Sequence, residues 1–288
     1  MALLFKKIAA AFAFSPTLEG LLTETARVQK YWNSELILIH VGEHSQQEEQ
    51  QLGELLEKIG LSEYGNLKIV WEKGNPVDRI LKTCSREQVD LLIAGALKKE
   101  SMVKYYLGTI ARKILRKADC SVLVLTSPSI LPTQIKNIVA NTEDTEFIEE
   151  VLTTACTIGQ KENSNFLHIV REIKMYGLTM SATENCTEEE YAALRQNLVQ
   201  DEITEVEEIL LRIPHEGLKV NVKLLSGKSG FELSQFAQRK NAELLIVGAP
   251  QRKFSFFDRL FTHDQEYLFA DLPCNLLVIN PRKEVSRG

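Results

Sequence analysis

Apolar and polar positions alternate along this chain in blocks that suit strands and helices in turn. Short, nearly continuous apolar runs such as Ile8–Phe14, Glu35–Val41 and Asp90–Gly95 predict strands that are buried on both faces. Between the runs, apolar residues recur at helical spacing, as they do from Leu18 to Ala26. The order of strand and helix predicts an α/β fold with a parallel sheet and helices on both faces.

The same pattern occurs twice in the chain. Gly227 follows Gly74 by 153 positions (227 − 74), and Gly248 follows Gly95 by the same 153 positions (248 − 95). A repeat of this length is typical of a duplicated domain rather than of a solenoid. The 288 residues are also more than one ordinary core needs, so we expect two domains.

We expect the first domain over residues 1–129 and the second over residues 130–288, because two prolines interrupt the pattern in Ser127–Pro132. The second copy carries extra residues, which we predict to be a helical insertion at about 178–215. Thr187 lies three positions before a glutamate there, which predicts a capping box at the start of a helix. The many carboxylates along this helix predict a solvated face rather than an acidic docking surface.

Composition limits the compartment and the partners. The formal net charge of −5 argues against a general nucleic-acid binder, and no apolar run reaches the length of a membrane helix. The five cysteines form no CxxC pair, which favours a reducing compartment, and we expect the cytoplasm. Lys6–Phe14 loosely resembles a leader peptide, but its counterpart Lys136–Ala140 lies inside the chain, so we expect a strand.

The strongest candidate chemistry lies in Asp90–Leu125. A strand ends at Gly95, a basic loop containing Lys98 follows, and Gly108-Thr109 opens an amphipathic helix. Backbone N–H groups at a helix N-terminus, with cations close by, favour an anion such as phosphate. The alternative is that the glycines only permit turns and that the lysines form a solvated patch.

The equivalent turn in the second copy predicts a closed site. Phe261-Thr262 stands where the first copy has glycine and threonine, and Asp264 and Glu266 replace the cations. Carboxylates suit a helix N-terminus that binds no anion, and the phenylalanine adds bulk where a glycine would let the backbone approach a ligand. We therefore expect no phosphate ligand in the second copy.

Four segments of the first half carry a family resemblance: Lys6–Pro16, Leu36–Val41, Leu91–Gly95 and Gly108–Leu125. These segments, with their counterparts in the second half, resemble the universal stress protein family. The resemblance implies a tandem pair of domains, each a five-stranded parallel sheet with adenine-nucleotide-hydrolase-like topology and helices on both faces. It also implies an internal pseudo-dimer, in which the last strands pair through Val122–Leu125 and Leu276–Ile279; a homodimer of the whole chain remains open.

Adenine nucleotide is the ligand that this resemblance implies, and ATP in the first domain is the cofactor that we expect. The family signature is glycine, two residues, glycine, nine residues, then glycine with serine or threonine. Gly95 and Gly108-Thr109 match it, Lys98 replaces the second glycine, and Ala13 stands where the family has an aspartate. In the second copy that aspartate position is expected near Asn141-Thr142. The implied contacts are Ala11, Ala13, Val41 (to adenine through its backbone), Ala94, Gly95, Lys98, Gly108, Thr109 and Ile110.

Three functions remain open at this point. The first is a cytoplasmic stress-response protein that binds ATP as a regulatory ligand and is not an enzyme. The second is a scaffold that binds no nucleotide and acts on an unknown protein partner. The third is a slow ATPase, for which the sequence offers no candidate base.

The remaining chemical groups predict structural roles. His40 and His44 are four residues apart but lie at a strand end, so no metal site is expected. Cys84, Cys120 and Cys274 are expected to be small apolar core residues rather than nucleophiles. The aromatic residues of the basic loop and of its counterpart, at 254–257, are expected to pack over the sheet.

Overall fold

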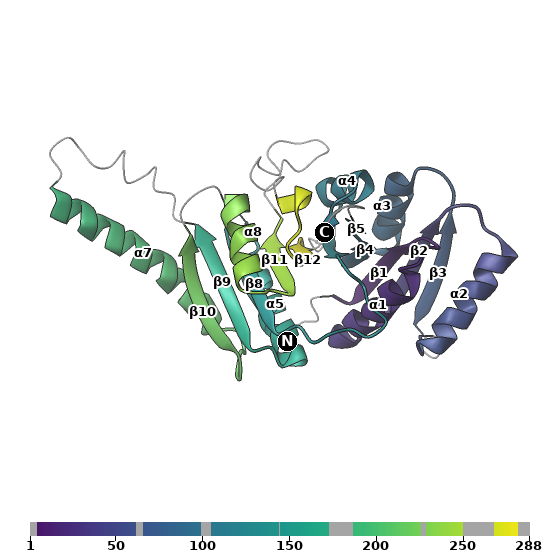
Figure 1. Cartoon of the computed structure of the whole chain (residues 1–288), viewed down its shortest axis with the longest axis horizontal. Helices are drawn as coiled ribbons and strands as arrows, with labels where there is room; N and C mark the ends of the chain where they lie inside the picture. Colours follow the sequence, from purple (N-terminus) through teal and green to yellow (C-terminus); the bar gives the residue numbers. More distant parts are fainter. Residues whose placement is uncertain are drawn as a thin grey trace, which may run out of the picture.

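The structure of this protein is a computed structural model. One ten-stranded sheet runs through both of its halves (Figure 1). Its strand order is β10-β9-β8-β11-β12-β7-β4-β1-β2-β3. The structure describes residues 5–61, 66–98, 105–143, 145–172, 187–225, 229–249 and 268–281.

The first half supplies five of these strands, all parallel to one another. A short antiparallel pair, β5 and β6, precedes the last helix of this half. The elements are β1 (Lys7–Phe12), α1 (Leu18–Trp32), β2 (Glu35–Val41), α2 (Gln46–Lys58), β3 (Leu67–Glu72), α3 (Pro76–Glu87), β4 (Leu91–Gly95), β5 (Leu97–Lys98), β6 (Tyr105–Tyr106), α4 (Thr109–Lys117) and β7 (Ser121–Leu125).

The second half repeats this strand order, and its five strands are again parallel. Its elements are β8 (Asn137–Asn141), α5 (Ile148–Glu162), β9 (Phe166–Glu172), α7 (Glu188–Leu210), β10 (Lys219–Leu225), α8 (Ser229–Arg239), β11 (Leu244–Gly248) and β12 (Asn275–Ile279). The α/β fold with two five-stranded parallel units is confirmed.

The two halves join through their last strands. β12 pairs antiparallel with β7, with Leu277 opposite Leu123. The pseudo-dimer pairing expected from the resemblance is therefore confirmed. Side chains fasten both ends of this pairing: Asn275 accepts from the backbone N–H of Thr126 at 2.9 Å, and Ser121 accepts from the N–H of Asn280 at 2.9 Å.

Two apolar layers cover the two faces of the sheet, and each layer spans both halves. One layer holds buried residues of α1, α2 and α5, such as Leu22, Leu52 and Leu152. The other holds buried residues of α3, α4 and α8, such as Ile114 and Phe236. Strands between two apolar layers explain the continuous apolar runs of the sequence.

Local capping signals are only partly followed. Thr187 and Glu190 form the expected capping box at the start of α7. The pair Ser15-Pro16 predicts a helix that is capped by Ser15, since serine is a good cap and proline suits the first helical position. This prediction is wrong: α1 starts at Leu18, its N-cap is Thr17, and no described side chain caps it. The Ser15 hydroxyl instead lies 3.1 Å from the Thr17 hydroxyl, because the chain makes a further turn after β1 before the helix begins.

Helix α7 lies beside β10 and extends beyond the outer strands of the second half (Figure 1). Val206 and Leu210 in its C-terminal part, and Ile213 just after it, are buried in the core. Glu205 and Glu208 on its other side are exposed. The predicted solvated acidic face is present along the described part of this helix.

Candidate functional site

The candidate site lies at β1, where the order of the strands in the first half reverses. β1 pairs with β2 on one side and with β4 on the other, and all three strands are parallel. The helices α1 and α2 that follow β1 and β2 cover one face, whereas α3 and α4 cover the other. Open α/β sheets bind ligands in the crevice beyond the carboxyl ends of the two strands at such a point.

Gly95 ends β4 at this edge of the sheet. It is exposed, and among the described residues no atom lies within 4 Å of a Cβ built on it. The Gly248 counterpart at the end of β11 is buried. A Cβ on Gly248 would lie 2.0 Å from the Thr145 hydroxyl oxygen and 2.3 Å from the Thr145 Cβ. The second crevice is therefore filled at this position by the protein itself.

The loops after the two central strands account for this difference. In the second half, the Thr145 hydroxyl accepts from the N–H of Phe147 at 3.0 Å and lies 3.4 Å from the carbonyl of Ala249, which holds Thr145 over Gly248. In the first half, Phe14 stacks on Trp71, with ring centroids 6.1 Å apart and planes 15° apart. Phe14 thereby packs the loop after β1 against the layer of α1 and α2.

The N-terminus of α4 supplies donors for an anion. Gly108 is its N-cap, with φ −65° and ψ 169°, and no side chain of the described residues caps the helix. The first turn holds no acidic residue. Lys113 is exposed, whereas Arg112 bends back and donates from Nε to the carbonyl of Leu107 at 2.9 Å. Free N–H groups and a nearby cation favour a phosphate group.

The structure places the predicted contact residues along one edge of the sheet and on the segment that leads into α4. Ala11 and Val41 are half-buried, Ala94 is buried, and Ala13 is exposed just beyond β1. Thr109 and Ile110 are exposed at the start of α4, and Gly108 is buried. Lys98 belongs to β5, where it pairs with Tyr105; its side chain lies outside the described part of the chain.

These residues fit an adenine nucleotide at its phosphate end. Gly95 leaves room for close approach, and the N-terminus of α4 offers backbone N–H donors. Ala13 offers no carboxylate to the ribose hydroxyls, so sugar and base would be held by backbone groups and apolar contact. The donor set is suited to phosphate more than to the nucleoside.

The strand register places the counterpart of Ala13 in the second half. Ile8 lies opposite Leu91, and Ile138 lies opposite Leu244, so these two residues occupy equivalent positions. Ala13 is five residues beyond Ile8, so its counterpart is Glu143, directly after the Asn141-Thr142 pair that the sequence suggested. Phe261, Thr262, Asp264 and Glu266, with which the sequence closed this site, lie outside the described residues.

The histidines and carboxylates form no metal site in the described ranges. His40 is buried, and its Nδ1 lies 3.2 Å from the carbonyl of Phe12, while His44 pairs with Glu49. Nowhere in the described ranges do three or more His, Cys, Asp or Glu side chains gather so that they could hold a metal ion. The described helices include none with the length and apolar character of a membrane span.

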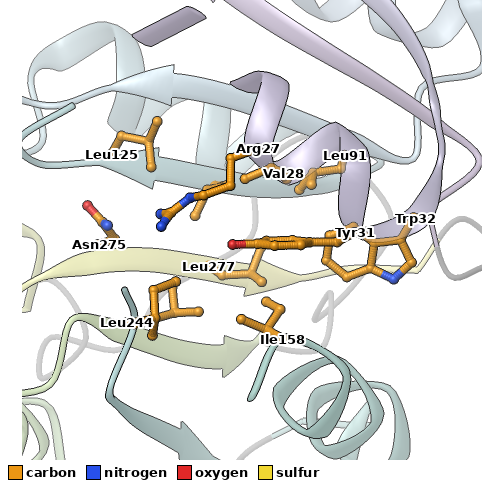
Figure 2. A pocket seen from close by; sticks show the side chains of 12 residues that line it. Arg27, Val28, Tyr31, Trp32, Leu91, Leu125, Ile158, Leu244, Asn275 and Leu277 are labelled. Carbon is orange, nitrogen blue, oxygen red and sulfur yellow. The ribbon is translucent and has the colours of Figure 1, made fainter. Parts of the chain in front are cut away.

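A small cavity lies at the junction of the halves, between α1, α5 and the sheet (Figure 2). Its volume is about 20 Å³, and Leu123, Ile158 and Leu277 are among its lining residues. Tyr31 and Arg27 reach it from α1 and bind the carboxylate of Glu162 on α5. This volume holds about one water molecule and excludes a nucleotide.

The crevice beside an uncapped helix defines an α/β protein of nucleotide-binding topology. Residues 4–126 match the Universal stress protein family. A universal stress protein of Methanocaldococcus jannaschii is 30% identical over 78 residues, which cover 26% of this chain and 46% of that protein. The match thus spans about half the length of this relative. The first domain of the chain is therefore similar to the universal stress protein family.

Solved structures extend the likeness in fold to both halves. A functionally unknown protein of Pseudomonas aeruginosa PAO1 is similar over 96% of this chain and 93% of its own, with a TM-score of 0.73 and 17% identity. A universal stress protein of Archaeoglobus fulgidus is similar over 96% of this chain and 99% of its own, with a TM-score of 0.62 and 15% identity. The duplicated fold therefore occurs in other proteins.

Proposed function

We propose that the first domain binds an adenine nucleotide, ATP, as a regulatory ligand and does not turn it over. The observation that carries this proposal is the open Gly95 beside the uncapped N-terminus of α4, set against the covered Gly248. The similarity of the first domain to the universal stress protein family supports the choice of ligand class. Under this proposal the second domain binds no nucleotide.

Under this proposal different residues bind different parts of the ligand. Gly108 and Thr109 would bind phosphate through backbone N–H groups, and Gly95 would let the phosphates approach β4. Ala11 and Ala94 would line the crevice, and Val41 would meet the base through its backbone. Since Ala13 offers no carboxylate, we expect affinity to depend on the number of phosphates more than on the ribose.

A regulatory effect has a route through the contact between the halves. Leu107, next to Gly108, is buried, and its N–H donates to the carbonyl of Phe269 in the second half at 3.0 Å. A ligand that orders the N-terminus of α4 would therefore favour one position of Leu107 relative to Phe269, and so one arrangement of the two halves. A ligand shifts such an equilibrium only by its difference in affinity for the two states.

Ligand-dependent unfolding tests the proposal. A saturating nucleotide at about 100 times its Kd adds roughly 2.7 kcal/mol to the stability of the folded chain. We expect ATP to raise the Tm of the wild type. The Tm of Gly95→Val should not change with ATP, since the valine side chain would fill the open space at this position. A matched control is Gly53→Ala on α2, where an added Cβ also meets nothing within 4 Å but lies away from the crevice. An equal shift in Gly95→Val and the wild type would refute this placement.

A scaffold is the second candidate, and helix α7 favours it. The helix extends beyond the outer strands and exposes carboxylates (Figure 1). Under this alternative ATP causes no shift in Tm. Binding of a protein partner is lost when exposed carboxylates of α7, such as Glu205 and Glu208, are replaced by lysine. Phosphate release over time would instead favour the slow ATPase.

A further inference from the structure

Two thiols meet in the first half, away from the nucleotide crevice. Cys84 lies on α3, and Cys120 lies in the turn between α4 and β7. Both are buried, at 5% and 4% exposure, and neither forms a disulfide. Both side chains line the same small cavity, and the neighbouring Cys120 thiol raises the pKa of Cys84. The two sulfur atoms are therefore neighbours in the reduced protein.

A cavity of about 70 Å³ reaches this pair. Both cysteines line it, together with apolar Leu81 and the polar residues Ser85 and Lys117. The volume is several times what a single water molecule requires. A small uncharged oxidant such as hydrogen peroxide fits such a space, whereas a glutathione-sized disulfide does not.

The second half shows that the fold does not need two thiols here. Cys274 repeats Cys120, but the counterpart of Cys84 is Ala237, which lies 153 residues further on (237 − 84), the same offset as the paired glycines. Ala237 and Cys274 are both buried. A methyl group fills this position of the helix in the second half, so the fold itself does not require a thiol here.

We propose that Cys84 and Cys120 form a reversible disulfide when the protein meets a peroxide. The sulfur of one cysteine attacks a peroxide oxygen, the O–O bond breaks, and one water leaves with the thiol proton, which gives a sulfenic acid. The second sulfur attacks that sulfur, the S–S bond forms, the S–O bond breaks, and a second water leaves. Two thiols are oxidised and one peroxide is reduced to two waters.

The environment makes this pair slow to react and selective in its product. The neighbouring Cys120 thiol and burial both raise the pKa of Cys84, so the thiolate is scarce at neutral pH. We therefore expect the rate of oxidation to rise with pH. Because the partner sulfur is already in contact, closure to the disulfide should precede further oxidation to the sulfinic acid.

Mass spectrometry of the full chain tests the proposal. The reduced protein is exposed to hydrogen peroxide under native conditions at pH 7 and pH 9, alkylated in denaturant, and digested without reduction. We expect one linked peptide pair, Cys84 with Cys120, which forms several-fold faster at pH 9 and disappears on reduction with dithiothreitol. We also expect the oxidised chain to unfold at a Tm several degrees above that of the reduced chain, because the link closes a long loop.

Cys84→Ala is the matched control, since it copies the second half. It should yield no linked peptide and no rise in Tm with peroxide; Cys120→Ser serves the same purpose if the first variant does not fold. The wild type decides the proposal without either variant. If Cys84 and Cys120 remain fully alkylated at both pH values, or link to other cysteines, or convert to sulfinic acids without linking, the proposal is overturned.

Discussion

The two halves have the same strand order and a glycine at the same strand end, yet only one glycine faces open space. A methyl group added to Gly95 would meet no atom of the described residues within 4 Å, whereas Gly248 lies under Thr145. The sheet is therefore not what separates the halves. The difference lies in the loop after each central strand, where Phe14 packs on Trp71 in the first half and Thr145 binds over β11 in the second. The two halves thus share their strand order, and the loop after the central strand of each half determines whether the glycine stays uncovered.

The two halves also supply different side chains to the contact between them. Helix α1 of the first half supplies Arg27 and Tyr31, and helix α5 of the second supplies Glu162, whose carboxylate binds both and accepts from the N–H of Ile135 at 3.0 Å. The Glu162 side chain is only 8% exposed. A single carboxylate thus connects two helices, the linker and the sheet.

The largest expected effect is the loss of this carboxylate. Glu162→Ala removes the acceptor of the Tyr31 hydroxyl and of the Ile135 N–H, and it leaves Arg27 with Glu24 as its carboxylate partner. Removing one member of a buried pair costs roughly 3 kcal/mol. The Tm should fall by about 6–10 °C for a chain of this size. Calorimetry measures the Tm and shows whether the halves still unfold together.

Glu19→Ala is the control for this variant. Glu19 pairs with Lys58 at 2.7 Å, but the two side chains are 31% and 64% exposed. Exposed pairs contribute about 0–1 kcal/mol. If Glu162→Ala costs no more than Glu19→Ala, the Glu162 cluster does not hold the halves together.

The next effect separates the two glycines. Gly248→Ala forces its methyl group into Thr145 and should cost roughly 1–3 kcal/mol of folding free energy. Gly95→Ala meets open space and should stay within about 0.5 kcal/mol of the wild type. Denaturant unfolding of the two variants measures both values on the same fold.

A second substitution identifies the cause. Thr145→Gly removes both the hydroxyl and the Cβ that lie within 2.3 Å of the new methyl group, so it should lower the cost of Gly248→Ala in the double variant. Thr145→Gly should have no such effect when it is combined with Gly95→Ala. Equal costs of alanine at both glycines would contradict the difference between the crevices.

The smallest effect concerns pH. Burial raises the pKa of Glu24 on α1 above its ordinary value of 4.5, and the nearby Arg27 opposes this only in part. A carboxyl with a higher pKa in the folded chain adds stability at low pH, which is lost as the pH rises above 4.5 through the folded pKa. The wild type should therefore lose more stability than Glu24→Gln between about pH 4.5 and 8. Its counterpart on α5 is the uncharged Thr154, buried and bonded to the carbonyl of Glu150.

Urea unfolding across this pH range compares the two chains. The difference in stability between wild type and Glu24→Gln should shift in favour of the variant as the pH rises. A difference that shifts in the opposite direction would mean that Arg27, rather than burial, governs Glu24.

The sequence was sufficient for the frame of the fold. Continuous apolar runs and helical spacing predicted the strands and the helices, and the paired glycines at a constant offset predicted the duplication, because burial on both sheet faces leaves a strong pattern. The N-terminal run Ile8–Phe14 was correctly predicted as a strand. The capping box at Thr187 was correct as well, since it depends only on neighbouring residues.

The site was less accessible from sequence. Thr145 is not part of any motif, and its place over Gly248 depends on the course of a loop, so the sequence could not indicate it. Ser15 looked like a helix cap, but the aromatic packing of Phe14 on Trp71 sets the path of the chain there. The contact between Cys84 and Cys120 joins positions 36 apart (120 − 84), which only the packing of α3 beside the start of β7 brings together.

Calorimetric titration of the full chain with ATP tests the central claim most directly. The account predicts one ATP per chain, no heat of binding in Gly95→Val, and unchanged binding in Gly248→Ala. Two ATP per chain, or binding that survives in Gly95→Val and is lost in Gly248→Ala, would contradict it.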